Sequence, residues 1–487
     1  MDTVVLFPSS GVGHLAPMTE FAKHLVSHGL SVSIVVLPPF SPFSTASSVN
    51  NFISGVTSHP SISFHHLPPI PVSHSPLPSP KPSRSPLLPL FLFLRAVNPY
   101  LRDLLRSISQ TSKIRALLLD FFCTEAFHVA AELQIPAYIF SASSSFIIAY
   151  FLYLPTLYNE ITEHFQDLGE TPIHLPGMPP IPASHLPSAV QMHDDIYRTY
   201  ANHFVRLTES KGIIINSFEH LEARTLKAIS QGLCLQGRVT PPVHCVGPLI
   251  TGRVAAERHE CLAWLDKQPK GSVVFLCFGS MGRFPAEQIK EIAIGLERSK
   301  QRFLWVVRSP PDTDNMFGSA GDADLDCLLP AGFGDRTEGR GMVVKDWAPQ
   351  VEVLNHEATG GFVTHCGWNS VLEAVCAGVG MIAWPLYAEQ KMNKVVLVEE
   401  MKLAVEMKGY GKGMVTAEEV ETRVRWFMES DGGTELRERA KEMKDRAAAA
   451  VSDGGSSHAT VVKLTGEWKK VLADDDDDDD IVQIQCG

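Results

Sequence analysis

Short apolar runs that are typical of β-strands alternate with helical patterns along most of the chain. The first helical pattern follows Pro17 and places Met18, Phe21 and Leu25 on one face of a helix. Strands that alternate with helices are typical of a parallel sheet flanked by helices, so the pattern predicts an α/β fold. In the first half of the chain the predicted strands span residues 3–7, 31–37, 61–65 and 115–120.

A second series of apolar runs follows in the second half of the chain. Two such series predict two doubly wound domains. The changeover lies within residues 238–253, where Pro241, Pro242 and the Gly247-Pro248 pair interrupt any regular element. The predicted strands of the second series span residues 272–278, 303–307, 342–345, 361–364 and 381–384.

Acidic residues gather at the C-terminus. A run of seven aspartates at residues 474–480 supplies seven of the twelve net negative charges, which leaves a body of about −5. Seven adjacent like charges repel one another and cannot pack, so we expect a disordered tail. The predicted divisions are a first domain over residues 1–245, a second over 254–457, a closing helix over 458–472 and the acidic tail over 473–487.

The composition excludes several classes of protein. With 487 residues, 45% of them hydrophobic and 20% charged, the chain is too long for one ordinary core and too apolar for a disordered protein. The sequence lacks the stripe of basic residues that would indicate a nucleic-acid partner. The most apolar stretches, residues 87–94 and 146–154, are shorter than the roughly 20 residues that cross a bilayer. We therefore expect neither a nucleic acid nor a membrane as a partner.

The N-terminus and the cysteines indicate a cytoplasmic protein. Met1 and Asp2 are followed at once by an apolar run, without the basic region or the cleavage site of a secretory signal. The nine cysteines are odd in number and form no C-x-x-C pair. They predict reduced thiols, and neither a disulfide framework nor a zinc site.

Two proline-rich segments interrupt the first series of strands. Residues 68–89 contain nine prolines mixed with serines and no acidic residue. This composition predicts a long loop or a polyproline-like segment, and residues 172–187 are similar. Such segments either drape over a binding site or are plain solvated loops, and both interpretations stay open here.

A glycine motif lies between the first predicted strand and the first predicted helix. Gly11, Gly13 and Ala16 match the G-x-G-x-x-A pattern of dinucleotide-binding folds. A site for NAD also needs an acidic residue about 20 positions further on. No Asp or Glu occurs anywhere in residues 21–102, so a nicotinamide site loses its second anchor. What remains is a tight turn that presents His14 at the carboxyl end of a strand.

Asp120 ends the fourth predicted strand of the first series. In the common strand order 3-2-1-4-5 the first and fourth strands are neighbours, about 4.8 Å apart. His14 and Asp120 are therefore expected to form a hydrogen bond, and an imidazole oriented by a carboxylate is a general base poised near neutral pH. The alternative is that His14 merely begins a helix and that Asp120 caps the next one.

The second series ends its fourth strand in the same manner, just before a helix at residues 363–370. Backbone N–H groups at that helix start, together with His365, Asn369 and Ser370, predict a site for a diphosphate. A structural interpretation also exists, because Ser370 and Glu373 have the spacing of a capping box. The two interpretations are compatible.

Residues 347–390 resemble the signature of plant secondary-product glycosyltransferases. Nearly the whole chain resembles the plant family-1 UDP-sugar glycosyltransferases, with further matches at Gly11-x-Gly13-His14-Leu15, at residues 119–123 and at Phe278-Gly279-Ser280. The resemblance implies the GT-B fold, in which two Rossmann-like domains face each other and the closing helix crosses back to the first domain. It also implies a metal-independent, inverting transfer of a sugar, with no cofactor besides the UDP-sugar itself.

The resemblance implies a role for each signature residue. His14 matches the base and Asp120 its partner, and Glu389 stands where the family more often has Asp. The uracil would contact Trp347 and Ala348, and the ribose would contact Gln350 and Glu373. The diphosphate would contact Ser280, His365, Asn369 and Ser370. The sugar would contact Trp368, Glu389 and Gln390, and Gly13 and Gly367 complete the expected donor site.

The expected acceptor pocket is apolar and belongs to the first domain. Such a lining favours a phenolic or terpenoid acceptor over a polar metabolite, and a flavonoid or chalcone is the leading expectation. Glucose is the expected sugar, and the expected target is a hydroxyl or else an aromatic carbon. The enzyme is expected to be a monomer. Two alternatives remain: an NAD(P)-dependent oxidoreductase, and a nucleotide-sugar-binding protein without catalysis. The candidate residues of the pocket are Phe121, Phe122, Phe140, Ser141 and Phe146.

Overall fold

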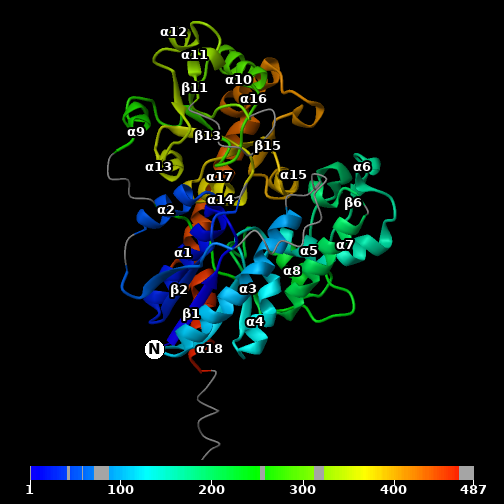
Figure 1. Ribbon diagram of the computed structural model, residues 1–487. Coiled ribbons are helices and arrows are strands. Elements are labelled where there is room, and N and C mark those ends of the chain that lie inside the picture. Colours follow the sequence, from blue (N-terminus) through cyan, green and yellow to red (C-terminus); the bar gives the residue numbers. More distant parts are fainter. Residues whose placement is uncertain are drawn as a thin grey trace, which may run out of the picture.

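Two parallel sheets, each covered by helices, form two lobes of the computed structural model (Figure 1). The predicted pair of doubly wound domains is therefore confirmed. The structure describes residues 2–40, 44–56, 59–70, 87–192, 194–252, 258–311 and 323–470.

The first sheet has the strand order β3-β2-β1-β4-β5-β8-β9. Its four N-terminal strands confirm the four predicted ones to within two residues at either end. The three strands β5, β8 and β9 were not predicted, because they are short and lie among other apolar segments. The strands are β1 (Asp2–Phe7), β2 (Ser31–Val36), β3 (Ile62–His66), β4 (Lys113–Asp120), β5 (Ala137–Ser141), β8 (Ile213–Ile215) and β9 (Val243–Cys245).

The helix after β1 begins earlier than its apolar pattern predicts. Helix α1 runs from Val12 to Ser27, so that Pro17 lies inside it and His14 lies in its first turn. Gly11 begins the helix with φ 106°, a conformation that favours glycine, and its carbonyl accepts from the N–H groups of His14 and Leu15. The expectation that the helix starts after Pro17 is wrong, because the turn at Gly11 begins the helix and Pro17 lies in its interior.

The remaining helices of the first lobe cover both faces of its sheet. Residues 87–89, the end of the first proline-rich segment, open a helix rather than a loop, and residues 71–86 lie outside the described residues. The helices are α2 (Ala46–Ser54), α3 (Leu87–Ser109), α4 (Phe127–Glu132), α5 (Ser145–Glu160), α6 (Phe165–Leu168), α7 (Asp195–Val205) and α8 (Ala223–Ser230).

The second proline-rich segment lies against the other lobe. It holds a small hairpin of β6 (Pro172–Ile173) and β7 (Ile181–Pro182). Just beyond the hairpin, the carbonyl of Ser184 accepts from Lys391 Nζ at 3.4 Å, and the His185 ring lies 6.4 Å from that of Tyr410. This segment is therefore not a plain solvated loop, because it contacts the second lobe.

The second sheet has the order β12-β11-β10-β13-β14-β15 and confirms all five predicted strands of that series. The strands are β10 (Val273–Cys277), β11 (Arg302–Val307), β12 (Gly341–Lys345), β13 (Thr359–Thr364), β14 (Met381–Ala383) and β15 (Ala404–Glu406). Its helices are α9 (Glu260–Leu265), α10 (Ala286–Ser299), α11 (Leu325–Leu328), α12 (Phe333–Arg336), α13 (Gln350–Asn355), α14 (Trp368–Ala377), α15 (Gln390–Val395), α16 (Ala417–Glu429) and α17 (Asp431–Val451).

The last described helix crosses from the second lobe to the first, as expected. Helix α18 (Ser456–Lys470) follows α17 and lies beside α1 and the first sheet, where Figure 1 shows it in red next to the blue strands. Val461, Leu464 and Trp468 are buried in one cluster with apolar residues of α1 and β1. The helix begins at Ser456, where the next residue, Ser457, donates its hydroxyl to the carbonyl of Gly247 at 2.6 Å. Residues 471–487, which include the acidic run, lie outside the described residues.

We expect the Trp468→Ala substitution to destabilise the first lobe by about 3–5 kcal/mol, the usual cost of removing a large buried aromatic side chain. Trp468 is only 1% exposed. The matched control on the same helix is Val462→Ala, because Val462 is 46% exposed and its substitution should change stability by less than about 0.5 kcal/mol. Urea denaturation of both variants gives the comparison, and equal midpoints would contradict the packing of α18 on the first lobe.

Candidate functional site

The predicted hydrogen bond between His14 and Asp120 is present. Strands β1 and β4 are parallel neighbours, with Phe7 opposite Leu119, so the residues that follow them meet at the same edge of the sheet. His14 Nδ1 lies 2.8 Å from Asp120 Oδ2. The other carboxylate oxygen of Asp120 accepts from the Phe122 backbone N–H at 3.0 Å. Both oxygens of this fully buried carboxylate are therefore engaged.

This arrangement leaves one ring nitrogen of His14 available for chemistry. A carboxylate oxygen can only accept, so Nδ1 carries the proton and Nε2 has a free lone pair. The side chain of His14 is 24% exposed, which allows a ligand to reach it. Burial pushes the pKa of His14 down, but the charge and hydrogen bond of Asp120 outweigh that effect and leave the pKa above its ordinary value.

Aromatic rings surround this histidine. The ring centroids of Phe121 and Phe122 lie 5.8 Å and 5.5 Å from that of His14. Behind them, Phe151 and Phe204 stack at 3.6 Å, and Phe151 lies 5.7 Å from Phe121. Sequence reasoning did not find Phe151 and Phe204, because they belong to α5 and α7, far along the chain. The face beside the His14 imidazole is thus apolar and aromatic.

Three other predicted residues of the acceptor pocket do not present a surface to it. Phe140 is fully buried on the other side of the first sheet, 5.8 Å from Phe21 of α1. Ser141 is also fully buried, and its hydroxyl donates to the carbonyl of Ser143. Phe146, 1% exposed, packs edge-on against Trp368 of the other lobe at 5.7 Å. They are core and interface residues, because β5 ends inside the packed layer rather than at its surface.

The second lobe presents the start of α14 at the carboxyl edge of its sheet. His365 is 6% exposed and lies between Gly279 and Gly367, since a Cβ at either glycine would fall 2.5 Å or less from the imidazole Nε2. Burial lowers the pKa of His365 to about 4, and the charge of Arg308 adds to the effect. Arg308, which sequence reasoning missed, donates to the carbonyl of Ser280 at 2.6 Å. His365 is neutral at pH 7 and can donate a hydrogen bond there.

Three polar residues predicted to hold the donor meet beside α14. Gln350 Nε2 donates to Ser370 Oγ at 2.8 Å and to Glu373 Oε2 at 2.6 Å. The predicted capping box is wrong, because α14 already begins at Trp368 with Gly367 as its N-cap and without a side-chain cap. Burial raises the pKa of Glu373 to about 7, against the opposing effect of the Gln350 hydrogen bond.

The backbone is strained next to three of the expected donor-binding residues. Among the described residues, only six other than glycine have positive φ. Asp346 (58°) precedes Trp347, Cys366 (66°) follows His365, and Ala388 (53°) precedes Glu389. Such conformations cost about 1–3 kcal/mol each and gather at binding sites. Trp347 is 44% exposed, which is unusual for so large an aromatic side chain. Its ring meets that of His259 edge-on, with the centroids 5.7 Å apart, and the rest of the side chain is accessible to a ligand. Ala348 beside it is buried.

Two of the residues expected at the sugar already have protein partners. Trp368 donates its indole N–H to the carbonyl of Asn216 at 2.9 Å and is 3% exposed. The amide oxygen of Gln390 accepts from the N–H groups of Leu386 and Tyr387. A free amide could both donate to and accept from sugar hydroxyls, but the oxygen of Gln390 holds this turn and only donation remains. Burial raises the pKa of Glu389, whose charge is felt at His14.

Hydrogen bonds between the lobes bring the two sets of residues together. Trp368 reaches Asn216 as described, and Asn369 Nδ2 donates to the carbonyl of Gly13 at 3.0 Å. Gly13 precedes the histidine and Asn369 lies in the first turn of α14. The imidazole of the first lobe therefore lies near the helix start of the second.

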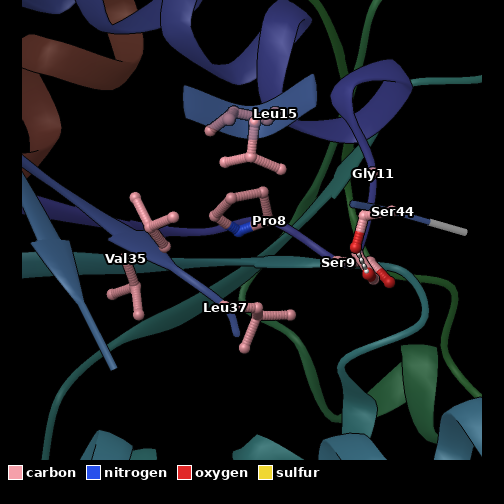
Figure 2. Close-up of a pocket in the computed structure, with 10 residues that line it drawn as sticks. Pro8, Ser9, Gly11, Leu15, Val35, Leu37 and Ser44 are labelled. Atoms are coloured by element: carbon pink, nitrogen blue, oxygen red, sulfur yellow. Dashed lines mark hydrogen bonds between the residues drawn. The ribbon is translucent and has the colours of Figure 1, made fainter. Parts of the chain in front are cut away.

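A small cavity lies next to this turn but is not the substrate site. It has a volume of about 10 Å³, room for one water molecule at most. Figure 2 shows Pro8, Leu15 and Val35 among the residues that line it. Ser10 and Ser44 also line the cavity, and their hydroxyl oxygens are hydrogen-bonded at 2.7 Å. A nucleotide sugar or a phenol cannot enter this space.

Within the described part of the chain, no group of three or more His, Cys, Asp or Glu residues is placed to hold a metal ion. In the same part, no helix combines the length and the apolar character needed to cross a membrane.

Comparison with known proteins identifies the family. The family model "UDP-glucoronosyl and UDP-glucosyl transferase" matches residues 215–431. The chain is 45% identical over 483 residues to the anthocyanidin 5,3-O-glucosyltransferase of a Rosa hybrid cultivar, an alignment that covers 96% of this chain and 99% of the relative. The chain belongs to the plant family-1 UDP-dependent glycosyltransferases. This membership excludes the oxidoreductase that the glycine motif alone would allow.

Two further comparisons extend this result. The phloretin 2'-O-glucosyltransferase of Malus domestica is 46% identical over 482 residues, covering 95% of this chain and 98% of the relative. The solved structure of Phytolacca americana UGT2 complexed with UDP-2fluoro-glucose and pterostilbene matches with a TM-score of 0.86 and 35% identity, covering 96% of this chain and all of that one. The UDP-glycosyltransferase described here therefore has the GT-B fold.

The Asp120→Asn substitution should lower kcat/KM by about 10²–10⁴-fold, the range for loss of a positioned general base. The Phe122 N–H would still donate to the amide oxygen, so the amide nitrogen would face His14. It would donate to Nδ1, and the neutral ring would then carry its proton on Nε2. The loss of the carboxylate also lowers the pKa of His14. Since the base works only when neutral, the acid limb of the pH profile of kcat/KM should move to lower pH. An unshifted limb with near wild-type turnover would contradict this role.

Donor binding should weaken as the pH falls below about 7, because protonation of Glu373 removes an acceptor for ribose hydroxyls. Calorimetry with UDP-glucose and no acceptor between pH 6 and pH 8 measures the effect, which approaches about tenfold for each pH unit below the pKa. The Glu373→Gln variant should bind UDP-glucose more weakly and with a flatter pH dependence. A variant as pH-dependent as the wild type would assign the effect to another group.

Proposed function

We propose that this enzyme transfers glucose from UDP-glucose to a hydroxyl of a small apolar phenol, with inversion at the anomeric carbon. The observation that carries the proposal is the oriented imidazole of His14, held by Asp120 beside the start of α14. A base on one lobe and an anion-binding helix start on the other are the two groups that a single displacement needs.

In the proposed reaction His14 Nε2 removes the proton of the acceptor hydroxyl. The hydroxyl oxygen attacks the anomeric carbon of glucose, and the bond from that carbon to the diphosphate oxygen breaks. UDP leaves with the negative charge, which the N–H groups of α14 and the neutral His365 stabilise by hydrogen bonds. Arg308 adds positive charge at the same edge of the second sheet. The departing UDP is thus neutralised by the protein's own groups, without a metal.

The donor would lie along the carboxyl edge of the second sheet. The exposed ring of Trp347 suits stacking on uracil, with the backbone of Ala348 pairing the edge of the base. Gln350 and Glu373 would take the ribose, and the Ser280, Asn369 and Ser370 groups the diphosphate. Glu389 would accept from glucose hydroxyls and Gln390 would donate to one. Trp368 would contribute packing rather than a hydrogen bond, because its N–H is already engaged.

The acceptor would lie against Phe121 and Phe122. These rings, backed by Phe151 and Phe204, offer a flat apolar surface beside the base. The relatives named above act on anthocyanidins and phloretin, and the solved neighbour holds pterostilbene. A flavonoid, chalcone or stilbene is thus the proposed acceptor class.

We further propose that the enzyme works in the cytosol as a monomer. The eight cysteines among the described residues are free thiols, which suits a reducing compartment. Each group named in the proposed reaction comes from one chain.

The test is a transfer assay with UDP-glucose or UDP-glucuronate as donor and a panel of chalcones, flavonoids and stilbenes as acceptors. We expect a mass gain of one hexose, released by acid because the bond is to oxygen. The activation free energy with UDP-glucuronate should be about 2 kcal/mol higher, which lowers kcat/KM roughly thirtyfold, because the Glu389 carboxylate repels the glucuronate carboxylate. The His14→Ala variant should lose about 10²–10⁴-fold in turnover while its UDP affinity barely changes.

Each part of the proposal has a result that would reject it. No product with any phenol would reject the acceptor class. An acid-stable product would indicate transfer to carbon. Equal efficiency with UDP-glucuronate would show that Glu389 does not face the sugar. Near wild-type turnover of His14→Ala would show that His14 is not the base.

A further inference from the structure

A proline interrupts the hydrogen-bond ladder of α1 one turn after the site. In a regular helix the N–H of residue 17 would donate to the carbonyl of residue 13. Pro17 has no N–H, and a proline ring inside a helix also presses against the carbonyl four residues before it. The carbonyl of Gly13 therefore has no partner within its own helix.

This free carbonyl accepts a hydrogen bond from the other lobe. Asn369 Nδ2, from the second residue of α14, lies 3.0 Å from it. A carbonyl can only accept, so the bond determines which end of the Asn369 amide faces Gly13. The Oδ1 end is buried and has no hydrogen-bond partner among the described residues. A buried acceptor without a partner is costly, and a hydroxyl of a bound ligand can satisfy it.

We propose that Pro17 is a positioning residue for the transfer reaction. By withholding its N–H, it leaves the Gly13 carbonyl to hold Asn369, which orients the amide toward the donor and sets the adjacent His14 against the start of α14. The inference rests on the proposed function, because it assigns Asn369 to the UDP-sugar. Ionised phosphate oxygens only accept, so they can pair with the second N–H of Asn369, whereas Oδ1 requires a sugar hydroxyl.

The consequence is that Pro17 has opposite effects on the stability of α1 and on donor binding. A proline in a helix interior normally destabilises the helix. In α1 that cost leaves a backbone acceptor free at the turn where Asn369 of the second lobe binds. A residue that served only the packing of α1 would change stability and donor binding in the same direction. Pro17 should change them in different directions.

The test is the Pro17→Ala variant, which restores the N–H and lets the Gly13 carbonyl turn back toward the helix axis. The loss of one hydrogen bond to an oriented amide should raise the KM for UDP-glucose or lower kcat, by about 3- to 10-fold in kcat/KM. The melting temperature should not fall. The matched control is Pro99→Ala, since Pro99 also lies inside a helix, α3, but is exposed. It should leave the kinetics unchanged.

A double-mutant cycle shows whether Pro17 acts through Asn369. In the Asn369→Ala background the Pro17→Ala change should cause less than about a twofold further loss, because the hydrogen bond is already absent. Unchanged kinetics of Pro17→Ala would overturn the proposal, since the Gly13 carbonyl would then accept hydrogen bonds from both the restored backbone N–H and Asn369 Nδ2. Equal losses in both backgrounds would also overturn it. If the wild type itself transfers no sugar, the proposed function fails instead, and calorimetry of UDP-glucose binding still tests the Pro17 effect.

Discussion

Parallel strands place all of their carboxyl ends at one edge of a sheet, and this constraint organises the whole molecule. Each lobe has its chemistry at that edge: His14 and Asp120 in the first, His365 and the start of α14 in the second. A transfer between two bound molecules needs the edges to meet. The hydrogen bonds of Asn369 and Trp368 across the lobes, and the return of α18 to the first lobe, hold them in that position.

Electrostatics divides the histidines of the two edges into different roles. His14 has a buried carboxylate as its partner, so its pKa is raised and its free nitrogen is basic. His365 has no such partner, so burial lowers its pKa to about 4, the charge of Arg308 adds to the effect, and the ring stays neutral. In the proposed reaction the same residue type therefore accepts a proton at one edge and donates a hydrogen bond at the other. Burial lowers the pKa of both rings, and the carboxylate of Asp120, present only beside His14, makes the difference between them.

Several side chains that resemble ligand contacts are instead supports. Gln390 uses its amide oxygen to hold a turn, and Trp368 uses its N–H to join the lobes. Phe140 and Phe146 pack inside the layers rather than facing an acceptor. A donor or acceptor atom that is already paired within the protein has less to offer a ligand. Under the proposed function, these pairings leave the carboxylate of Glu389 and the unpaired N–H groups as the candidates that would determine donor choice.

The sequence by itself determined the two sheets and the family, because apolar patterns and a long signature are properties of neighbouring residues. The meeting of His14 with Asp120, 106 positions apart, could be predicted because doubly wound sheets share a common strand order. Only the tertiary structure decided that α1 starts before Pro17, that α14 needs no capping box, and which rings stand beside His14. Phe151 and Phe204 lie on different helices, α5 (Ser145–Glu160) and α7 (Asp195–Val205), and no local pattern brings them together. Contacts of this kind depend on how whole layers pack, and that is a property of the folded chain alone.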